Sequence, residues 1–184
     1  MEEKIMLVLS DFSARYLLKH FTQISSAEFD QLGNGITQQE VDNDLNEIGS
    51  KFHFSFAAGP FSLISILNNT IPISSIHQSN GRVAYIYKFT TTIGTTGIIE
   101  IKSLPKSEWP QLTKKNRGNY ETWVYSSNTK IETDEIVLVA EGLNVISCFP
   151  GPYAPPFPNA NMNQNDFNKA TLFWDEYAFI ENEK

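Results

Sequence analysis

Residues 135–151 have the sequence EIVLVAEGLNVISCFPG and contain two apolar runs, EIVLVA and LNVISCF, each of a length typical of a strand. The second run ends in Phe149-Pro-Gly and continues directly into a proline-rich segment, PYAPPFP. Ser147 and the single cysteine, Cys148, lie near the tip of this run. The other apolar runs have the pattern of a packed core, so we expect this tip to carry the functional site.

Several earlier segments show the two-residue alternation that is typical of half-buried strands. In the sequence GRVAYIYKFT, every second residue from Val83 to Phe89 is apolar. Further strands are predicted at residues 52–56, 97–102 and 120–126. Residues 104–119, LPKSEWPQLTKKNRGN, are rich in proline and lysine and predict a loop, whereas residues 61–69, FSLISILNN, fit either a helix or a strand.

The first fifty residues and the last twenty have helical patterns. Ser10 or Asp11 can cap a helix with the sequence SARYLLKHF. Thr37 and Glu40 have the spacing of a capping box, in which each side chain bonds a free backbone N–H of the first turn. A final helix, FNKATLFWDEYAFI, is predicted to run to Ile180.

The order of these elements predicts an α+β fold, because helices and strands fall into separate runs along the chain. We expect a helical N-terminal third packed on an antiparallel sheet of about five strands, with one C-terminal helix. Residues 1–50 would form the helical segment and residues 51–184 the α+β domain, or the two would form one single domain.

The composition limits the function classes. Twenty-one acidic and 14 basic residues give a formal net charge of −7, which counts against tight non-specific binding of nucleic acid and suits a basic partner. One cysteine permits no internal disulfide or thiolate metal site, and no phosphate-binding loop or metal-ligand pattern is present in the sequence. The N-terminus lacks the pattern of a signal peptide and no run approaches ~20 apolar residues, so we expect a cytoplasmic protein without a membrane span or cofactor.

The C-terminal half, residues 81–180, resembles a family of ribonucleases. The pieces are IGTTGIIEI, KKNRGN, EIVLVA, LNVISCFPG with its proline-rich exit, and FWDEYAFI. In this order they are similar to the barnase–EndoU–colicin–RelE-like (BECR) nuclease domains at the C-termini of bacterial polymorphic and phage-borne toxins. The sequence departs from that pattern in having a lysine-rich loop, residues 114–117, in having Ser147 and Cys148 in place of Thr and Ala, and in having Tyr177 where a histidine is common.

The resemblance implies metal-independent cleavage of RNA, which needs a base, a stabiliser of the charge on phosphorus, and an acid. Arg117, Lys115 and Lys114 are the candidate cations, and arginine suits phosphate best because a guanidinium binds two phosphate oxygens at once. His20 is the leading candidate base, because related nucleases often carry an early helical histidine. Ser147 could bond a phosphate oxygen and Tyr177 could donate a proton.

Two other histidines, His53 and His77, are further candidates. The ribonuclease hypothesis, for an active or a degenerate enzyme, requires Arg117, Lys115 and at least one histidine to meet beside Ser147 in one cleft. The main alternative is a non-enzymatic acidic interaction protein, similar to an immunity protein or antitoxin, which binds a basic protein partner through a broad acidic face. A third hypothesis is a small-ligand binder with an aromatic-lined pocket.

Overall fold

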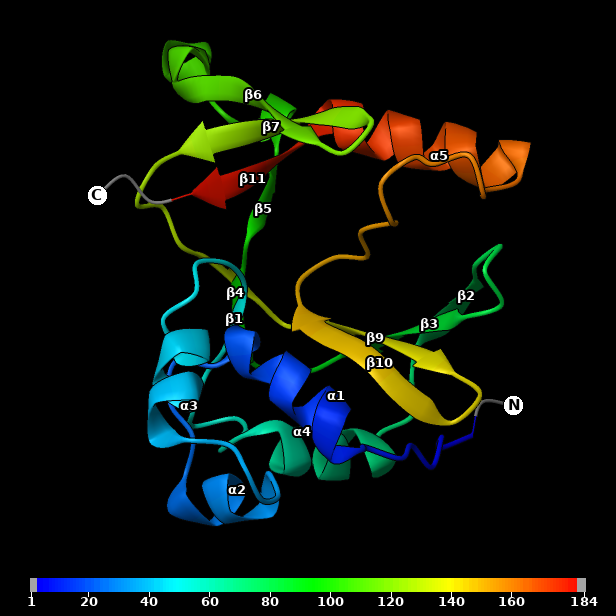
Figure 1. The fold of residues 1–184 in the computed structure, drawn as a ribbon. Coiled ribbons are helices and arrows are strands. Elements are labelled where there is room, and N and C mark those ends of the chain that lie inside the picture. The colour runs from blue at the N-terminus through cyan, green and yellow to red at the C-terminus, as the bar shows by residue number, and fades with distance from the viewer. Residues whose placement is uncertain (1–2, 182–184) are drawn as a thin grey trace.

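The computed structural model describes residues 3–181, which fold into an α+β structure (Figure 1). The α-helices are α1 (Asp11–Leu17), α2 (Ser26–Gln31), α3 (Gln38–Leu45), α4 (Pro60–Asn68) and α5 (Gln164–Glu176). The strands are β1 (Lys51–Phe52), β2 (Ser74–His77), β3 (Val83–Lys88), β4 (Gly94–Thr96), β5 (Ile98–Glu100), β6 (Leu112–Arg117), β7 (Tyr120–Ser126), β8 (Ile131–Thr133), β9 (Glu135–Glu141), β10 (Asn144–Pro150) and β11 (Tyr177–Glu181). Short 3-10 turns lie at Leu18–His20, Ile101–Ser103 and Lys106–Gln111.

The strands form three sheets rather than the single antiparallel sheet of about five strands that the sequence predicted. Their orders are β10-β9-β3-β2, β5-β11-β7-β6 and β1-β4-β8. The first and third sheets are antiparallel. The second sheet is mixed, because β11 pairs in parallel with β7 and antiparallel with β5. The predicted single sheet fails because the chain changes partners within one or two residues. At Asp134, for example, β8 ends its pairing with β4 and β9 begins its pairing with β3.

Local chemistry sets the helix starts as predicted. The Ser10 hydroxyl accepts a hydrogen bond from the backbone N–H of Ser13, and the Thr37 hydroxyl does the same for Glu40. The ambiguous segment at 61–69 is helical, because a buried carboxylate caps its first turn. Glu28 accepts bonds from the backbone N–H groups of Phe61 (2.8 Å) and Ser62 (2.9 Å).

Three predicted elements differ from the structure. The predicted loop at 104–119 contains β6, whose backbone pairs with β7 although its side chains are polar. The phenylalanine alternation at 52–56 yields only the two-residue strand β1 before the chain turns. The last helix ends at Glu176, because the next five residues extend and pair with β5 and β7 on both sides.

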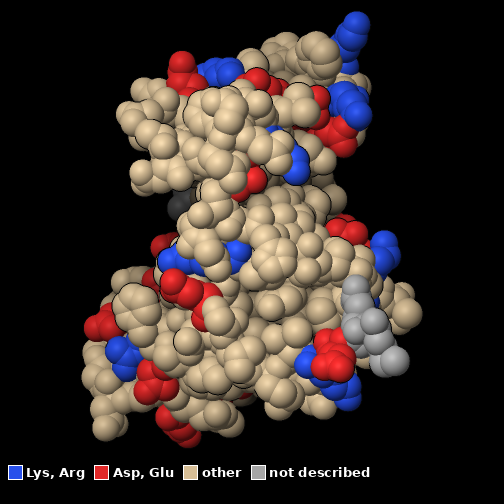
Figure 2. Space-filling view, turned by 90° about the vertical axis from the view of Figure 1, so that its right-hand side faces the viewer, with Lys and Arg blue, Asp and Glu red and all other residues tan. Residues whose placement is uncertain are grey.

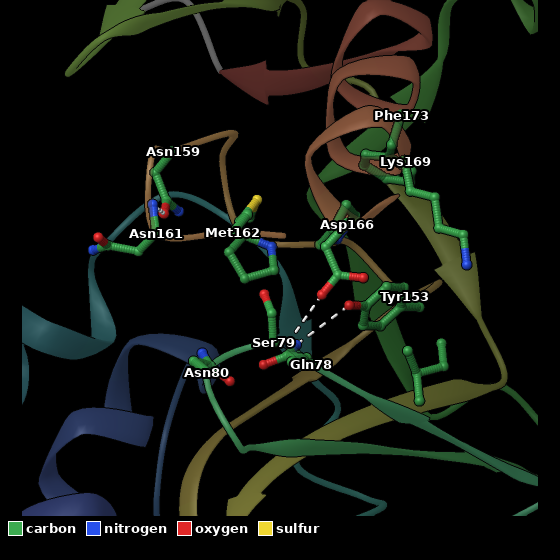
Figure 3. Close-up of a pocket in the computed structure, with 13 residues that line it drawn as sticks. Gln78, Ser79, Asn80, Tyr153, Asn159, Asn161, Met162, Asp166, Lys169 and Phe173 are labelled. Atoms are coloured by element: carbon green, nitrogen blue, oxygen red, sulfur yellow. Dashed lines mark hydrogen bonds between the residues drawn. The ribbon is translucent and has the colours of Figure 1, made fainter. Parts of the chain in front are cut away.

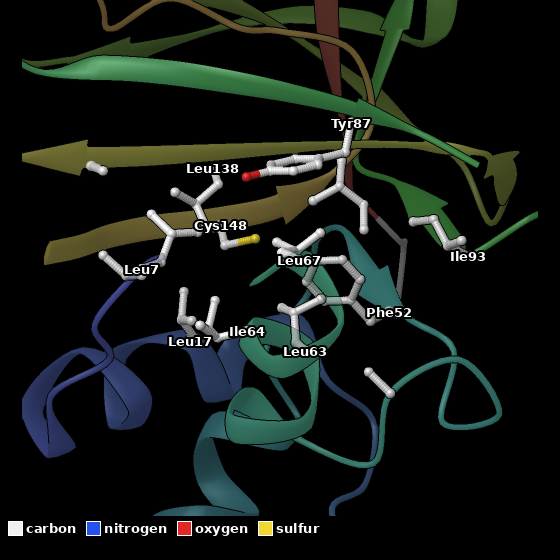
Figure 4. Close-up of a cluster of buried hydrophobic side chains, with 14 of the residues drawn as sticks. Leu7, Leu17, Phe52, Leu63, Ile64, Leu67, Tyr87, Ile93, Leu138 and Cys148 are labelled. Carbon is white, nitrogen blue, oxygen red and sulfur yellow. The ribbon is translucent and has the colours of Figure 1, made fainter. Parts of the chain in front are cut away.

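The largest core lies between the N-terminal helices and the β10-β9-β3 face (Figure 4). Leu17 of α1 and Leu63 of α4 meet Leu138 of β9, and all three side chains are fully buried. Cys148 of β10 lies in the same cluster, where burial raises the pKa of its thiol. This cysteine is therefore a core residue that stays protonated, not a nucleophile.

The second sheet and α5 form a separate layer above this core (Figure 1). Leu104, Tyr125, Ala178 and Ile180 form its own buried cluster. The proline-rich residues 151–163 connect β10 to α5 across the space between the two layers, and Figure 2 shows the molecule narrowing there. Within residues 3–181, no helix combines the length and apolar character that a membrane crossing requires.

Tyr87 gives a direct test of the packing in the first core. Its side chain is fully buried, and its hydroxyl has no hydrogen-bond partner within residues 3–181. Because an unpaired buried hydroxyl is destabilising, Tyr87→Phe should raise the free energy of unfolding by about 1 kcal/mol. Urea denaturation measures the change.

The matched control is Tyr125→Phe, since Tyr125 is equally buried but donates its hydroxyl to Glu108 Oε2 at 2.8 Å. The free energy of unfolding of that variant should fall by about 1 kcal/mol, because the hydrogen bond to Glu108 is lost. An equal loss of stability in the Tyr87 and Tyr125 variants would contradict the assignment of an unpaired hydroxyl.

Candidate functional site

A cleft of about 1150 Å³ lies between the two layers. Its lower wall comes from α1, the following 3-10 turn and the face of β10, and its upper wall from β6 and β11. The turn between β2 and β3 and the proline-rich residues 154–157 form its sides. The cleft therefore lies beside the tip of β10, the segment that the sequence singled out.

Four of the side chains that the sequence predicted as site residues line this one cleft. They are His20, Lys115, Arg117 and Ser147. Tyr177 lies outside the cleft, half-buried, with its ring stacked on Phe173 at a centroid distance of 4.1 Å. Lys114, the third cation that the sequence predicted, also lies outside it, because on strand β6 its side chain points to the opposite face from those of Lys115 and Arg117. Their proposed catalytic roles stay predictions, but the structure gathers residues from β6, β10 and the first helical segment that are far apart in sequence.

Lys115 and Arg117 face the cleft together, because residues two apart on a strand share a face. Both pair with Oε1 of Glu181, at 3.5 Å from Lys115 Nζ and 3.3 Å from an Arg117 guanidinium nitrogen. The Arg117 guanidinium carbon also lies 5.0 Å from the centroid of the Phe179 ring. Arg117 Nε is buried and has no hydrogen-bond partner among the described residues, so the guanidinium keeps unused donor capacity.

Two further cations line the cleft, Lys19 and Arg82, and neither stood out in the sequence. A lone arginine in a turn and a lysine in a helix give no pattern that marks a site. Within residues 3–181, the cleft thus carries four cationic side chains against the two carboxylates Glu47 and Glu181. The local charge is positive although the whole protein is acidic, so the cleft can attract an anion.

His20 is held in its neutral form at the inner wall of the cleft. Its Nδ1 lies 3.0 Å from the carbonyl oxygen of Ser50, which can only accept, so this nitrogen carries the hydrogen. Burial, together with the nearby Lys19 and Lys51 charges, lowers the pKa of His20 to about 4, although the bond to Ser50 opposes this shift. Nε2 has no partner within residues 3–181 and is left as an acceptor, which is the arrangement that a general base requires.

The other two histidines lie outside the cleft. His53 Nε2 pairs with Oε2 of Glu132 at 2.6 Å, and His77 is exposed at the end of β2. His20 is therefore the histidine that the structure brings to Lys115, Arg117 and Ser147. Among the described residues, no three His, Cys, Asp or Glu side chains come together as a metal-binding group.

Aromatic rings form much of the remaining cleft wall. Phe149 at the β10 tip lies 6.3 Å from the His20 ring, between centroids. Trp174 of α5 stacks on Phe179 at 4.9 Å and contacts Phe157 at 5.0 Å. The indole N–H of Trp174 donates to the Pro155 carbonyl oxygen at 3.0 Å, which fixes the ring at the cleft edge. Cations and aromatic rings together suit an anionic ligand that also carries flat rings.

Comparison with known proteins assigns neither a family nor a function to this chain. No family model and no curated protein matches the chain. Among solved structures, the chain is similar to a crystal structure of a conserved hypothetical protein from Toxoplasma gondii ME49. The TM-score is 0.45 and the identity 10%, over 98% of this chain and 95% of that chain. A likeness of this size carries no argument about function.

The pKa of His20 predicts a specific pH dependence of stability. Because this pKa is about 4 in the folded protein and 6.5 for a free histidine, the unfolded chain binds the proton more readily between these values. The stabilisation is fully present above pH 6.5 and is lost as the pH falls toward 4. Between pH 7 and pH 5, wild type should lose about 1–2 kcal/mol more than His20→Gln, measured by urea denaturation at each pH.

The control for this comparison is His77→Gln, because His77 is an exposed histidine. Measured at the same two pH values, this variant shows what the loss of an exposed histidine does to stability. If the His20 variant differs from wild type by a constant amount, His20 is not held neutral by burial.

Proposed function

We propose that the protein is a metal-independent endoribonuclease-like protein whose cleft binds single-stranded RNA. The observation that supports this proposal most directly is the gathering of His20, Lys115, Arg117 and Ser147 around one cleft. These residue types match the needs of phosphodiester cleavage: a neutral imidazole to accept a proton and cations to stabilise charge on phosphorus.

The proposed reaction breaks one P–O bond and forms another. Nε2 of His20 accepts the proton of the ribose 2′-hydroxyl, and the 2′ oxygen attacks phosphorus. The bond from phosphorus to the 5′ oxygen breaks, which leaves a 2′,3′-cyclic phosphate. The leaving 5′ oxygen takes its proton from water in this scheme, because Tyr177, the acid expected from the sequence, lies outside the cleft. The hydroxide that remains takes the proton from Nε2 of His20, which returns the imidazole to its neutral form. Lys115 and Arg117 stabilise the extra negative charge on the non-bridging oxygens, and the Ser147 hydroxyl donates to one of them.

Single-stranded RNA fits the cleft better than a duplex. Phe149, Phe157 and Trp174 offer ring surfaces on which unpaired bases can stack. A duplex hides its bases and presents two rows of phosphates, which favour a broad basic face. This protein is acidic overall but brings four of its 14 Lys and Arg side chains to one cleft, which suits a short unpaired segment.

In this proposal, the strength of the ion pairs that Glu181 makes with Lys115 and Arg117 decides whether the enzyme is active or degenerate. Its carboxylate pairs with both Lys115 and Arg117, where it occupies the position that a phosphate would take. The pair is partly exposed, so a phosphate can compete for the cations in water. If Glu181 holds them too tightly, the cleft binds RNA weakly and cleavage is lost.

The alternative, an acidic interaction protein that binds a basic partner, needs a broad acidic face. On the face in Figure 2, acidic and basic side chains are interspersed instead of forming one acidic surface. The positive cleft also favours an anionic ligand over a basic one. If the purified protein binds no RNA, the acidic interaction protein becomes the better-supported hypothesis.

Replacement of Arg117 tests the ribonuclease proposal. Arg117→Ala should lower the rate of cleavage of a fluorophore-quencher RNA oligonucleotide by about 10²–10³-fold, because it removes a cation from the transition state. The control is Lys114→Ala on the same strand. Lys114 lies over the Trp123 ring, 4.3 Å from its centroid and away from the cleft, so its loss should leave the rate unchanged.

Thermal unfolding of both variants checks that they remain folded. The proposal fails if wild type does not cleave the oligonucleotide in the absence of divalent metal, or if the Arg117 and Lys114 variants cleave it equally.

Replacement of Glu181 tests its competition with phosphate. Glu181→Gln removes a negative charge between Lys115 and Arg117, so RNA affinity should rise by about threefold to tenfold at low salt. Fluorescence anisotropy with a labelled oligonucleotide measures the change. The control Glu176→Gln removes an exposed charge at the end of α5 and should change affinity by less than about twofold. Equal gains in both variants would show that only the net charge matters.

A further inference from the structure

A second, smaller cavity of about 380 Å³ adjoins the cleft (Figure 3). It lies between the turn that joins β2 to β3, the proline-rich segment and α5. Gln78, Asn80, Pro155 and Pro156 line both spaces and form their common wall. A chain-like ligand in the cleft could therefore place one of its groups in the smaller cavity without leaving the first space. The volume is at the lower end of the range for small-molecule sites, about 300–1,000 Å³.

Two hydrogen bonds hold this cavity in shape. The backbone N–H of Ser79 donates to Asp166 Oδ2 at 2.9 Å, which ties the β2–β3 turn to the first turn of α5. The Gln78 amide donates to the Tyr153 hydroxyl at 3.3 Å, which ties the same turn to the proline-rich segment. Figure 3 shows both contacts as dashed lines. The site is thus formed before any ligand arrives, which lowers the cost of ordering it.

The cavity combines flat apolar walls with a polar edge. Ile76, Pro155, Pro156, Met162 and Phe173 supply the apolar surface. Asn161 and Lys169 also line the space, and both residues are exposed. Asp166 keeps its Oδ1 free, because the bond from Ser79 uses only Oδ2.

Tyr153 adds a hydrogen-bond donor to this edge. Its oxygen accepts from Gln78, so its own hydrogen is available to a ligand. Burial raises the pKa of the hydroxyl, which keeps that hydrogen in place at neutral pH. The cavity therefore offers both donors and acceptors at its rim and apolar surface within.

We propose that the smaller cavity is a nucleobase-binding subsite, which takes one unstacked base of an RNA strand whose phosphates lie in the cleft. This inference rests on the proposed function. A base has two flat apolar faces that pack against proline and phenylalanine rings, and an edge of mixed donors and acceptors that matches Asp166 and Tyr153. A lipid tail would leave this polar edge unpaired, and a free phosphate would leave the apolar walls unused.

The experiment measures binding of the four ribonucleoside 5′-monophosphates to the intact protein by isothermal titration calorimetry. At least one should bind with Kd of about 1 mM or tighter. Ribose 5-phosphate, which has the same phosphate and sugar but no base, should bind at least about tenfold more weakly, because it lacks the group that fills the cavity. The subsite is absent if ribose 5-phosphate binds as well as every nucleotide, or if none of the five binds.

A variant that fills the smaller cavity tests whether the nucleotide binds there. Ile76→Trp on the edge strand β2 replaces a small aliphatic side chain with an indole ring that fills the cavity. This variant should weaken nucleotide binding by at least about tenfold. Ile73→Trp is the matched control, since Ile73 precedes the same strand, is 53% exposed and lies outside the cavity. Asp166→Asn keeps an oxygen for Ser79 and changes one free acceptor to a donor, so it alters which base binds best. Unchanged binding and base preference in Ile76→Trp and Asp166→Asn would overturn the proposal.

The two proposals fail separately in these measurements. If a nucleotide binds and Ile76→Trp blocks it, the subsite stands even when wild type cleaves no RNA. If wild type cleaves RNA in an Arg117-dependent way but no nucleotide prefers the cavity, the ribonuclease proposal stands and the subsite is overturned.

Discussion

The cleft depends on the central position of β11 in its sheet. This strand pairs with β5 on one side and β7 on the other, so its backbone is fixed along both edges. Alternation then sends Ala178 and Ile180 into the buried cluster and brings Phe179 and Glu181 against Arg117. One short strand thus closes the core of the upper layer and orients the cations of β6. If α5 continued as a helix through residues 177–181, it could not both close this core and contact Arg117.

The electrostatics of the cleft follow from this placement. Lys115 and Arg117 lie side by side on β6, and like charges in that position repel. Glu181 offsets the repulsion from β11, which lies beyond β7 in the same sheet, and Phe179 provides a ring surface for the guanidinium. The arrangement keeps two cations together in a protein of net charge −7 without an external anion. The same carboxylate is therefore both a structural partner and a competitor for any phosphate.

Local patterns in the sequence predict the parts of this structure that local chemistry controls. The caps at Ser10 and Thr37 and the apolar strands β9 and β10 needed no distant partner to be recognised. The polar strand β6 was missed, because its pairing with β7 and not its side chains makes it a strand. The end of α5 was missed for the same reason, since helical periodicity continues past Glu176 and only the pairing of β11 breaks it. Residue chemistry and the family resemblance pointed to His20, Lys115, Arg117 and Ser147, and also to Tyr177, which lies outside the cleft. Arg82 and Glu181 enter the site through tertiary placement alone.

His20 and the cations are coupled through charge. Burial and the charges of Lys19 and Lys51 lower the pKa of His20, so the empty cleft holds a weak base. If the cleft binds a phosphate as proposed, its negative charge would oppose the charges of Lys19 and Lys51. Such binding would raise the pKa of His20 and make the imidazole a stronger base. In this arrangement the ligand itself tunes the group that would act on it.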